Sequence, residues 1–158
     1  MTVSPDRKPV VVADLAEAID AVRRSGLRLT SARRLVLEAL LAARTPISAE
    51  DIADGLGGRM TQSDIASVYR NLETLGELGL VRHFHAGHGP GRYVLEGAGD
   101  REYITCESCG ALESVDPSAL DGIRDEIRAL SGFEARFSHV PIVGLCARCA
   151  RAGNGTRG

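Results

Sequence analysis

All four cysteines of this 158-residue chain fall into two Cys-x-x-Cys pairs. The pairs are Cys106 with Cys109 and Cys146 with Cys149. Two such pairs supply the four thiolates of a tetrahedral Zn²⁺ site, and the two intervening residues let both sulfurs of a pair reach one ion. A pair that cycles to a disulfide is the alternative, although a thioredoxin-like motif needs only a single pair. We therefore predict a structural Zn²⁺ that ties together both ends of a small C-terminal domain.

The four histidines could form a second, reversible metal site. His83 and His85 stand two residues apart in a predicted strand, so their side chains share one face. His88 follows in a glycine-rich turn, and His139 lies near the second cysteine pair. Imidazole nitrogen suits nickel, zinc, copper and iron. Taken singly, each histidine fits an ordinary surface or hydrogen-bonded residue better than a metal ligand, and His83 and His85 could instead contact phosphate.

Arginines gather near the start of the chain, although the whole chain has a net charge of −2. The segment from Val22 to Thr45 holds a single acid, Glu38. Its arginines are Arg23, Arg24, Arg28, Arg33, Arg34 and Arg44. A clustered basic face favours binding to phosphates more than the net charge indicates. A solvated helix surface is the alternative interpretation.

A helix expected from about Gln62 to Leu78 has two distinct faces at 3.6 residues per turn. The apolar face, expected to point to the core, consists of Ile65, Val68, Leu72 and Leu75. The opposite face carries Ser63, Ser67, Arg70 and Thr74, with Tyr69 at its boundary. Small hydroxyls around one arginine suit the DNA major groove, where a guanidinium can pair bidentately with guanine. An ordinary amphipathic surface helix would show the same two faces.

The preceding elements complete a winged helix-turn-helix. Apolar spacing and capping residues predict helices over 13–25, 32–44 and 49–56. Strands are expected over 80–84 and 92–95, around a turn rich in glycine. We expect residues 1–12 to form a flexible arm and residues 13–96 to form this DNA-binding domain.

The composition changes after the glycine-containing segment 97–100, which we interpret as a hinge. Strands are expected at 103–106 and 111–115, a helix at 118–130 and a strand-like segment at 133–144. Residues 101–150 should form the zinc-containing domain, and the tail 151–158 should be disordered. The predicted fold class is therefore α+β, with an N-terminal winged helix and a C-terminal α/β domain around a four-cysteine site.

The composition is that of an ordinary globular protein, with 44% hydrophobic and 25% charged residues. No apolar run approaches the roughly 20 residues that cross a bilayer. The N-terminal residues do not form a signal peptide pattern. We expect a cytoplasmic protein without a membrane partner.

The order of motifs from Leu27 to Cys149 resembles the ferric uptake regulator (Fur) family. The motifs are GLRLTSARRLVLEAL, SVYRNLETLGELGLV, GRYVLE, CESCG and HVPIVGLCARC. The resemblance implies a homodimeric, metal-dependent repressor that binds double-stranded operator DNA and controls metal uptake or homeostasis genes. It also implies that Tyr69 and Arg70 contact DNA and that Arg28 reaches the minor groove. We add Arg33, Arg34 and Ser67 as expected DNA contacts.

The wing sequence HFHAGHG is most similar to the nickel-responsive (Nur) branch of this family. That similarity implies a regulatory site made by His83, His85 and His139, with His88 close by. The chain departs from the family before the first cysteine pair, where GDREYITC replaces a histidine-rich run. Only Asp100 and Glu102 remain there as oxygen ligands. Ni²⁺ or Zn²⁺ is the favoured regulatory metal, and Fe²⁺ or Mn²⁺ the alternative.

Two other functions would use some of the same motifs. A DNA-binding regulator with structural zinc alone would respond to a non-metal or redox signal. A zinc hydrolase or deaminase would need an open coordination position and a glutamate base. The four cysteines would fill every position of the zinc, and the chain has no His-x-Glu motif. We therefore expect neither an enzyme nor a small organic substrate.

Overall fold

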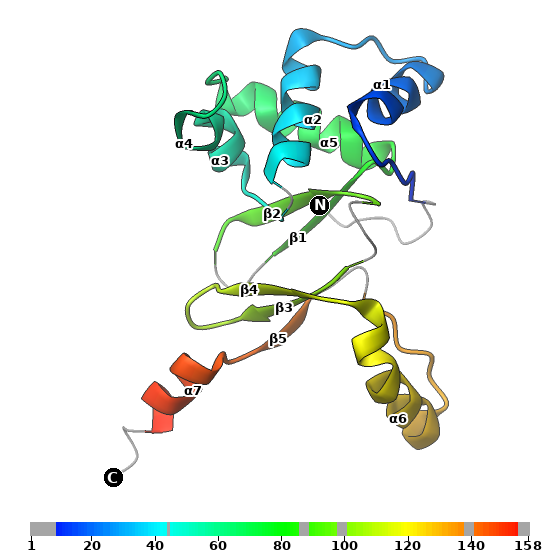
Figure 1. The fold of residues 1–158 in the computed structure, drawn as a ribbon, viewed down its shortest axis with the longest axis vertical. Coiled ribbons are helices and arrows are strands. Elements are labelled where there is room, and N and C mark those ends of the chain that lie inside the picture. Colours follow the sequence, from blue (N-terminus) through cyan, green and yellow to red (C-terminus); the bar gives the residue numbers. More distant parts are fainter. Residues whose placement is uncertain (1–8, 44, 86–88, 98–100, 138–140, 155–158) are drawn as a thin grey trace. The chain divides into compact units, whose positions relative to one another are not determined.

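The computed structural model describes residues 9–43, 45–85, 89–97, 101–137 and 141–154. The chain forms two compact units (Figure 1). The first comprises Met1–His83 with Gly91–Gly99, and the second comprises Phe84–Pro90 with Asp100–Gly158. Residues 98–100 of the expected hinge lie outside the described part, and the domain boundaries stay predictions.

With the exception of one irregular turn, the helices of the first unit begin at side-chain caps, which satisfy backbone N–H groups that lack a partner in the first turn. They are α1 (Leu15–Arg24), α2 (Ser31–Ala43), α3 (Ala49–Ala53), the irregular turn α4 (Gly55–Gly58) and α5 (Ile65–Glu77). Ser48 and Asp51 form the predicted capping box of α3. Asp64 accepts a hydrogen bond of 2.8 Å from the Ser67 N–H. That cap starts α5 three residues later than the sequence spacing predicts.

Helix α5 packs against α2 and α3, and a two-stranded sheet follows it (Figure 1). The sheet pairs β1 (Val81–His85) with β2 (Gly91–Leu95). The centre of the unit is formed by fully buried aliphatic side chains, among them Leu37, Ile52, Leu72, Leu75 and Leu80. This arrangement confirms the predicted winged helix-turn-helix.

Two expectations for the first unit were wrong in detail. The described end of the predicted arm is not free, because Val12 is buried in the core. The Val10 N–H donates to Gly79 O at 2.9 Å, so burial and backbone pairing both hold this segment. Ile65 is 39% exposed although it belongs to the apolar face. Helical side chains lean toward the N-terminus, so that of the first residue points beyond the helix.

The second unit is built on a three-stranded sheet in the order β4-β3-β5. Its elements are β3 (Glu102–Cys106), β4 (Leu112–Val115), the 3₁₀ helix η1 (Pro117–Leu120), α6 (Asp121–Ser131), β5 (Ile142–Gly144) and α7 (Ala147–Asn154). Strand β3 pairs antiparallel with β4 and parallel with β5. The parallel pairing places Cys106 opposite Gly144, near the second cysteine pair.

The second unit also departs from two expectations. Residues 133–137 of the predicted strand are irregular, and the Phe137 ring lies 5.4 Å from the Arg124 guanidinium. This segment therefore returns along α6, and only Ile142–Gly144 joins the sheet. Residues 151–154 belong to α7, whose first turn is closed by a 2.9 Å bond from the Ala150 N–H to Cys146 O. Among the described residues, no helix has the length and apolar character needed to span a bilayer.

Candidate metal centre and nucleic-acid interface

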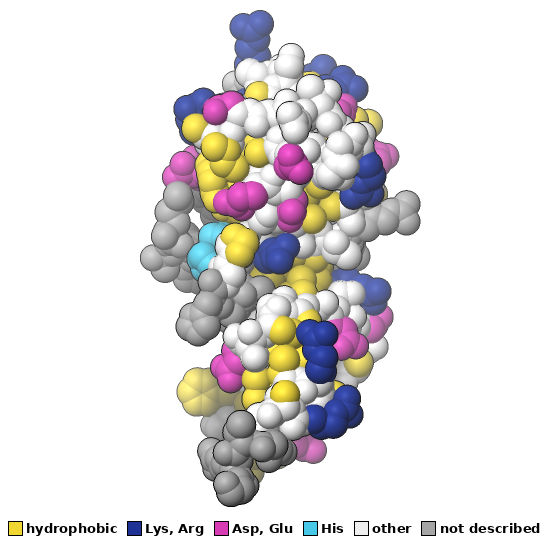
Figure 2. Space-filling model, turned by 90° about the vertical axis from the view of Figure 1, so that its left-hand side faces the viewer, with side chains coloured by type: hydrophobic (Ala, Val, Ile, Leu, Met, Phe, Trp, Pro, Cys, Tyr) yellow, Lys and Arg dark blue, Asp and Glu magenta, His cyan; other side chains and the backbone are white. Residues whose placement is uncertain are grey.

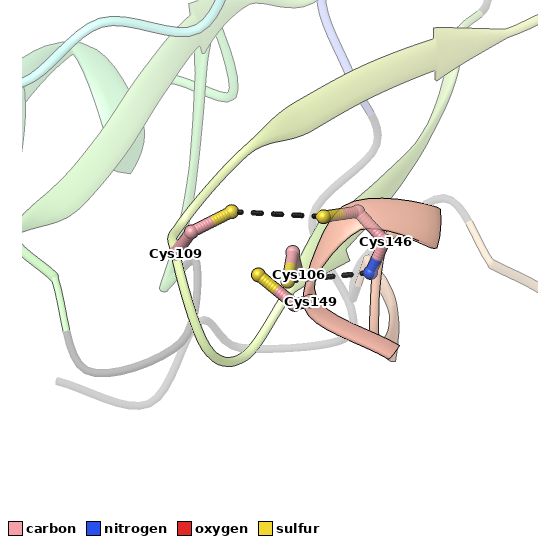
Figure 3. Close-up of side chains that lie close together, drawn as sticks. All are labelled: Cys106, Cys109, Cys146 and Cys149. Carbon is pink, nitrogen blue, oxygen red and sulfur yellow. Dashed lines mark hydrogen bonds between the residues drawn. The ribbon is translucent and has the colours of Figure 1, made fainter. Parts of the chain in front are cut away.

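The four cysteines meet at one end of the three-stranded sheet (Figure 3). Cys106 ends β3, and Cys109 lies in the tight turn that follows. That turn is closed by a 2.9 Å bond from the Gly110 N–H to Cys106 O, with Gly110 at φ 71°, a conformation that favours glycine. Cys146 immediately precedes α7, and Cys149 lies in its first turn. A strand end and a helix start thus present all four sulfurs to one point.

The spacing of the sulfurs fits a zinc ion. The four Sγ atoms lie within 4.8 Å of one another, and those of Cys109 and Cys146 are 3.8 Å apart. In a tetrahedral site with Zn–S bonds of about 2.3 Å, the sulfurs stand about 3.8 Å apart. All four cysteines are free thiols rather than disulfides. The cluster therefore matches the predicted structural Zn²⁺.

The surroundings of Cys106 favour the thiolate that a metal needs. The Cys146 N–H donates to Cys106 Sγ at 3.3 Å. This bond, followed by a backbone hydrogen bond from Cys109, lowers the pKa of Cys106 to about 6. For Cys109, a backbone hydrogen bond from Ala111 is the main cause of a lowered pKa. Backbone dipoles thus prepare this pair for metal binding.

Two of the four candidate histidines are described. His83 and His85 both lie in β1, as predicted. His83 is half-buried and stacks on Tyr93, with ring centroids 4.5 Å apart, whereas His85 is exposed. Histidine atoms reach the surface shown in Figure 2. His88 and His139 lie outside the described residues, as does Asp100.

Glu102 is buried, and its carboxylate is held by an arginine. The Arg124 Nη2 atom donates to Glu102 Oε1 at 2.7 Å. The same guanidinium donates to the carbonyl of Pro117 at 2.7 Å and to Asp121 at 2.9 Å. Arg124 thus gives Glu102 Oε1 a structural partner, whereas Oε2 is buried without a hydrogen-bond partner among the described residues. The ligand role of Glu102 therefore stays a prediction.

Helix α5 presents its candidate DNA contacts beside the short helix α3. Arg70 is exposed, Ser67 is half-buried and Tyr69 is 41% exposed. The Tyr69 hydroxyl donates a 2.8 Å hydrogen bond to Glu50 Oε1 in α3. That bond is the main cause of a raised pKa for Tyr69. The carboxylate thus holds the phenol in its protonated form.

The candidate arginines before and within α2 differ in their surroundings. Arg28 is exposed. Arg33 is half-buried and donates from Nη1 to the Arg28 carbonyl. Arg34 forms a 2.7 Å ion pair with Glu38 one turn along α2. Arg34 is also exposed, and Arg33 supports the backbone at Arg28.

Three residues of these sites were missed from the sequence: Glu50, Tyr93 and Arg124. The sequence pattern alone indicates solvent-exposed charges at Glu50 and Arg124 and an ordinary strand residue at Tyr93. The sequence did point to Tyr93, because this residue lies in GRYVLE, one of the motifs that carry the family resemblance. The partners of the other two stand 19 and 22 residues away in the chain, where no local pattern reaches.

Comparison with known proteins agrees with the geometry. The ferric uptake regulator family matches residues 24–142. The peroxide operon regulator of Bacillus subtilis (strain 168) is 28% identical over 141 residues, which cover 89% of this chain and 97% of that protein. The structure of the Helicobacter pylori ferric uptake regulator matches with a TM-score of 0.68 at 18% sequence identity. The match covers 89% of this chain and 97% of that chain. A zinc uptake regulator complexed with zinc and DNA is 29% identical, covers 89% of this chain and 95% of its own, and has a TM-score of 0.50.

The fold and the cysteine cluster define a winged-helix protein whose second unit carries four cysteines that fit a structural zinc ion. Since the family match spans most of the chain, the protein belongs to the ferric uptake regulator family. Members of this family are transcriptional regulators and not enzymes. Their regulatory metals differ, so family membership leaves the metal of this chain open.

Proposed function

We propose that the protein is a homodimeric transcriptional repressor that binds operator DNA when a regulatory divalent metal is bound. The observation that carries this proposal is the combination of an exposed recognition face on α5 with a cysteine cluster of zinc dimensions. The first unit would bind DNA, and the second would hold the structural zinc and dimerise. Relatives bearing the same fold include a zinc uptake regulator complexed with zinc and DNA.

On DNA, Arg70 and Tyr69 of α5 would lie in the major groove, with Ser67 allowing close approach. The exposed Arg28 would contact the sugar-phosphate backbone or the minor groove. Arg33 would contribute by supporting the Arg28 backbone, and Arg34 by adding charge along α2. Phosphate contacts of this kind position a protein, whereas contacts with base edges specify the sequence.

The second unit offers a surface suited to self-association. Helix α6 has no buried side chain, yet its sequence repeats apolar residues at helical spacing. Ile123 is 46% exposed and Leu130 is 88% exposed, and Phe133 just beyond the helix is 73% exposed. Hydrophobic side chains also reach the surface in Figure 2. Large apolar side chains that are exposed on one element are typical of a protein–protein interface. We propose that the partner at this interface is a second copy of the chain.

For the regulatory site we propose His83, His85 and His139 as ligands, with His88 as an additional candidate. An all-imidazole site favours Ni²⁺ or Zn²⁺, and Fe²⁺ or Mn²⁺ is the alternative. The preference for Ni²⁺ depends only on the similarity of the sequence HFHAGHG to the nickel-responsive branch. Glu102 is a second additional candidate: Arg124 holds its Oε1 atom, and its buried Oε2 atom has no hydrogen-bond partner among the described residues.

A peroxide-responsive regulator is the second candidate function. It is favoured by the 28% identity to the Bacillus subtilis peroxide operon regulator over nearly the full length of both chains. In this version the bound metal would be Fe²⁺, and DNA release would follow treatment with hydrogen peroxide.

One titration separates these candidates. Purified protein with its structural zinc would be mixed with operator DNA and with Ni²⁺, Zn²⁺, Fe²⁺ or Mn²⁺ in turn, before and after peroxide. His83→Ala, His85→Ala and His139→Ala should each abolish metal-enhanced binding while keeping the structural zinc. Release by peroxide only in the Fe²⁺ sample would favour the second candidate. DNA binding unaffected by every metal would contradict both.

A further inference from the structure

The imidazole of His83 lies against two residues of the neighbouring strand β2. Its ring stacks on Tyr93 of β2 at 4.5 Å, with the two planes only 11° from parallel. On the same strand, Gly91 lies against the ring edge, and a Cβ atom there would overlap His83 Nε2. The absence of a side chain at position 91 and the aromatic ring at position 93 thus set the orientation of His83.

Tyr93 also connects to the helix-turn-helix through its backbone. Its N–H donates to Ile47 O at 2.8 Å, and the Ile47 N–H donates to Tyr93 O at 3.0 Å. Ile47 immediately precedes Ser48, the N-cap of α3. A shift of Tyr93 would therefore act on the backbone next to the N-cap of α3.

Helix α3 is in turn joined to the recognition helix. Glu50, in its first turn, accepts the 2.8 Å hydrogen bond from Tyr69 of α5. The stack, the backbone pair, the helix cap and this hydrogen bond form one unbroken series of contacts. All of its members belong to the first unit of the chain.

We propose that Tyr93 is a positioning residue, which together with Gly91 couples metal binding at His83 to the DNA-reading surface of α5. The proposal rests on the proposed function, in which His83 is a metal ligand. A metal restricts the imidazole to orientations that point a nitrogen at the ion. Because the His83 ring is stacked on Tyr93, a reoriented imidazole shifts Tyr93. The backbone hydrogen bonds between Tyr93 and Ile47 pass this shift to α3, and the Glu50–Tyr69 hydrogen bond passes it on to α5. Coupling of this kind requires two conformations of the protein, and both the metal and the DNA must bind one of them more tightly than the other.

The test measures the ratio of operator affinities with and without Ni²⁺ or Zn²⁺ for the full-length protein. Tyr93→Leu removes the stack, whereas Tyr93→Phe keeps it. Gly91→Ala pushes the His83 ring away without changing Tyr93, and the obstacle is a side chain that can move, so the fold should persist. Gly153→Ala near the end of α7 is the matched control, since a Cβ there meets nothing within 4 Å. Zinc content and circular dichroism verify folding.

We expect Tyr93→Leu and Gly91→Ala to reduce the metal-dependent ratio by at least about fivefold, the lower end of ordinary coupling between sites. Tyr93→Phe and Gly153→Ala should retain the ratio of the wild type. Coupling is reciprocal, so operator DNA should also tighten metal binding in the wild type, and Tyr93→Leu should lose this effect. A purely structural role would weaken DNA binding equally with and without metal and leave the ratio unchanged, which would overturn the proposal.

The outcome also separates this inference from the proposed function. A wild type that responds to metal, together with Tyr93→Leu and Gly91→Ala variants that respond equally, contradicts the coupling role alone. A wild type whose DNA binding ignores every metal contradicts both.

Discussion

The Tyr69 hydroxyl donates its single proton to the carboxylate of Glu50, at 2.8 Å and across 19 positions of sequence. Tyr69 therefore has no proton left to donate to a phosphate while this bond persists. Tyr69 as a whole residue is 41% exposed, so its ring remains available for apolar contact with a thymine methyl group or a sugar. The pair joins the two helices of the helix-turn-helix at the surface proposed to meet DNA.

The first prediction concerns this pair and pH. Backbone hydrogen bonding, followed by the bond from Tyr69, lowers the pKa of Glu50. A lowered carboxyl pKa stabilises the fold above the ordinary pKa, and the contribution is lost as pH falls through the lowered value. We expect Glu50→Gln to destabilise the protein at neutral pH, with a difference that shrinks below the ordinary value of about 4.3. Urea unfolding at several pH values measures this.

Tyrosine titration provides an independent readout of the same pair. The Glu50 carboxylate raises the pKa of Tyr69, so Glu50→Gln should let one of the three tyrosines ionise at lower pH. Asp54→Asn, an exposed acid after the same helix, is the control. An unchanged ultraviolet titration in Glu50→Gln would show that the hydrogen bond is absent in solution.

The second prediction separates base recognition from phosphate binding. Arg70→Ala should cost about 1–3 kcal/mol in operator binding and relax sequence preference, as expected for one bidentate base contact. Arg28→Ala should weaken all sequences and reduce the slope of binding against salt by about one charge. Both are measured by fluorescence anisotropy with operator and scrambled DNA. Equal loss on both DNAs for Arg70→Ala would remove α5 from the recognition role.

The third prediction concerns the cysteine centre. Cys106→Ser should lose the zinc and unfold the second unit, because structural zinc contributes on the order of 10 kcal/mol of binding free energy in small zinc-binding peptides. Glu107→Ser, between the two cysteines of the same turn, should keep one zinc per chain. Metal analysis and gel filtration check both variants. A folded, zinc-free wild type would contradict the structural role.

The fourth prediction concerns the ion pair of Glu102 and Arg124. The two side chains are 7% and 19% exposed, so Arg124→Ala leaves a buried carboxylate unpaired at a cost of about 3–5 kcal/mol. Arg128→Ala on the same helix breaks an exposed pair with Asp125 and should cost at most about 1 kcal/mol. Urea unfolding compares the two variants. If Glu102→Gln instead lowered the number of regulatory metals bound, Glu102 would be a ligand after all.

The sequence by itself determined the features that depend on near neighbours along the chain. Helical spacing placed Val68, Leu72 and Leu75 in the core, and the Ser48 capping box marked the start of α3. Each Cys-x-x-Cys pair carries its own ligand geometry, because two residues suffice to turn the backbone around one ion. The winged helix and the four-cysteine cluster were therefore predictable.

Only the tertiary structure decided which distant side chains meet. The Glu50–Tyr69 bond, the His83–Tyr93 stack and the Glu102–Arg124 pair each join separate elements whose packing brings them together. The same packing buried Val12 in the predicted arm and left residues 133–137 outside the sheet. Backbone periodicity specifies which face a residue takes, whereas the partner on that face is chosen by how the elements dock. The contacts proposed to link metal to DNA are of this second kind.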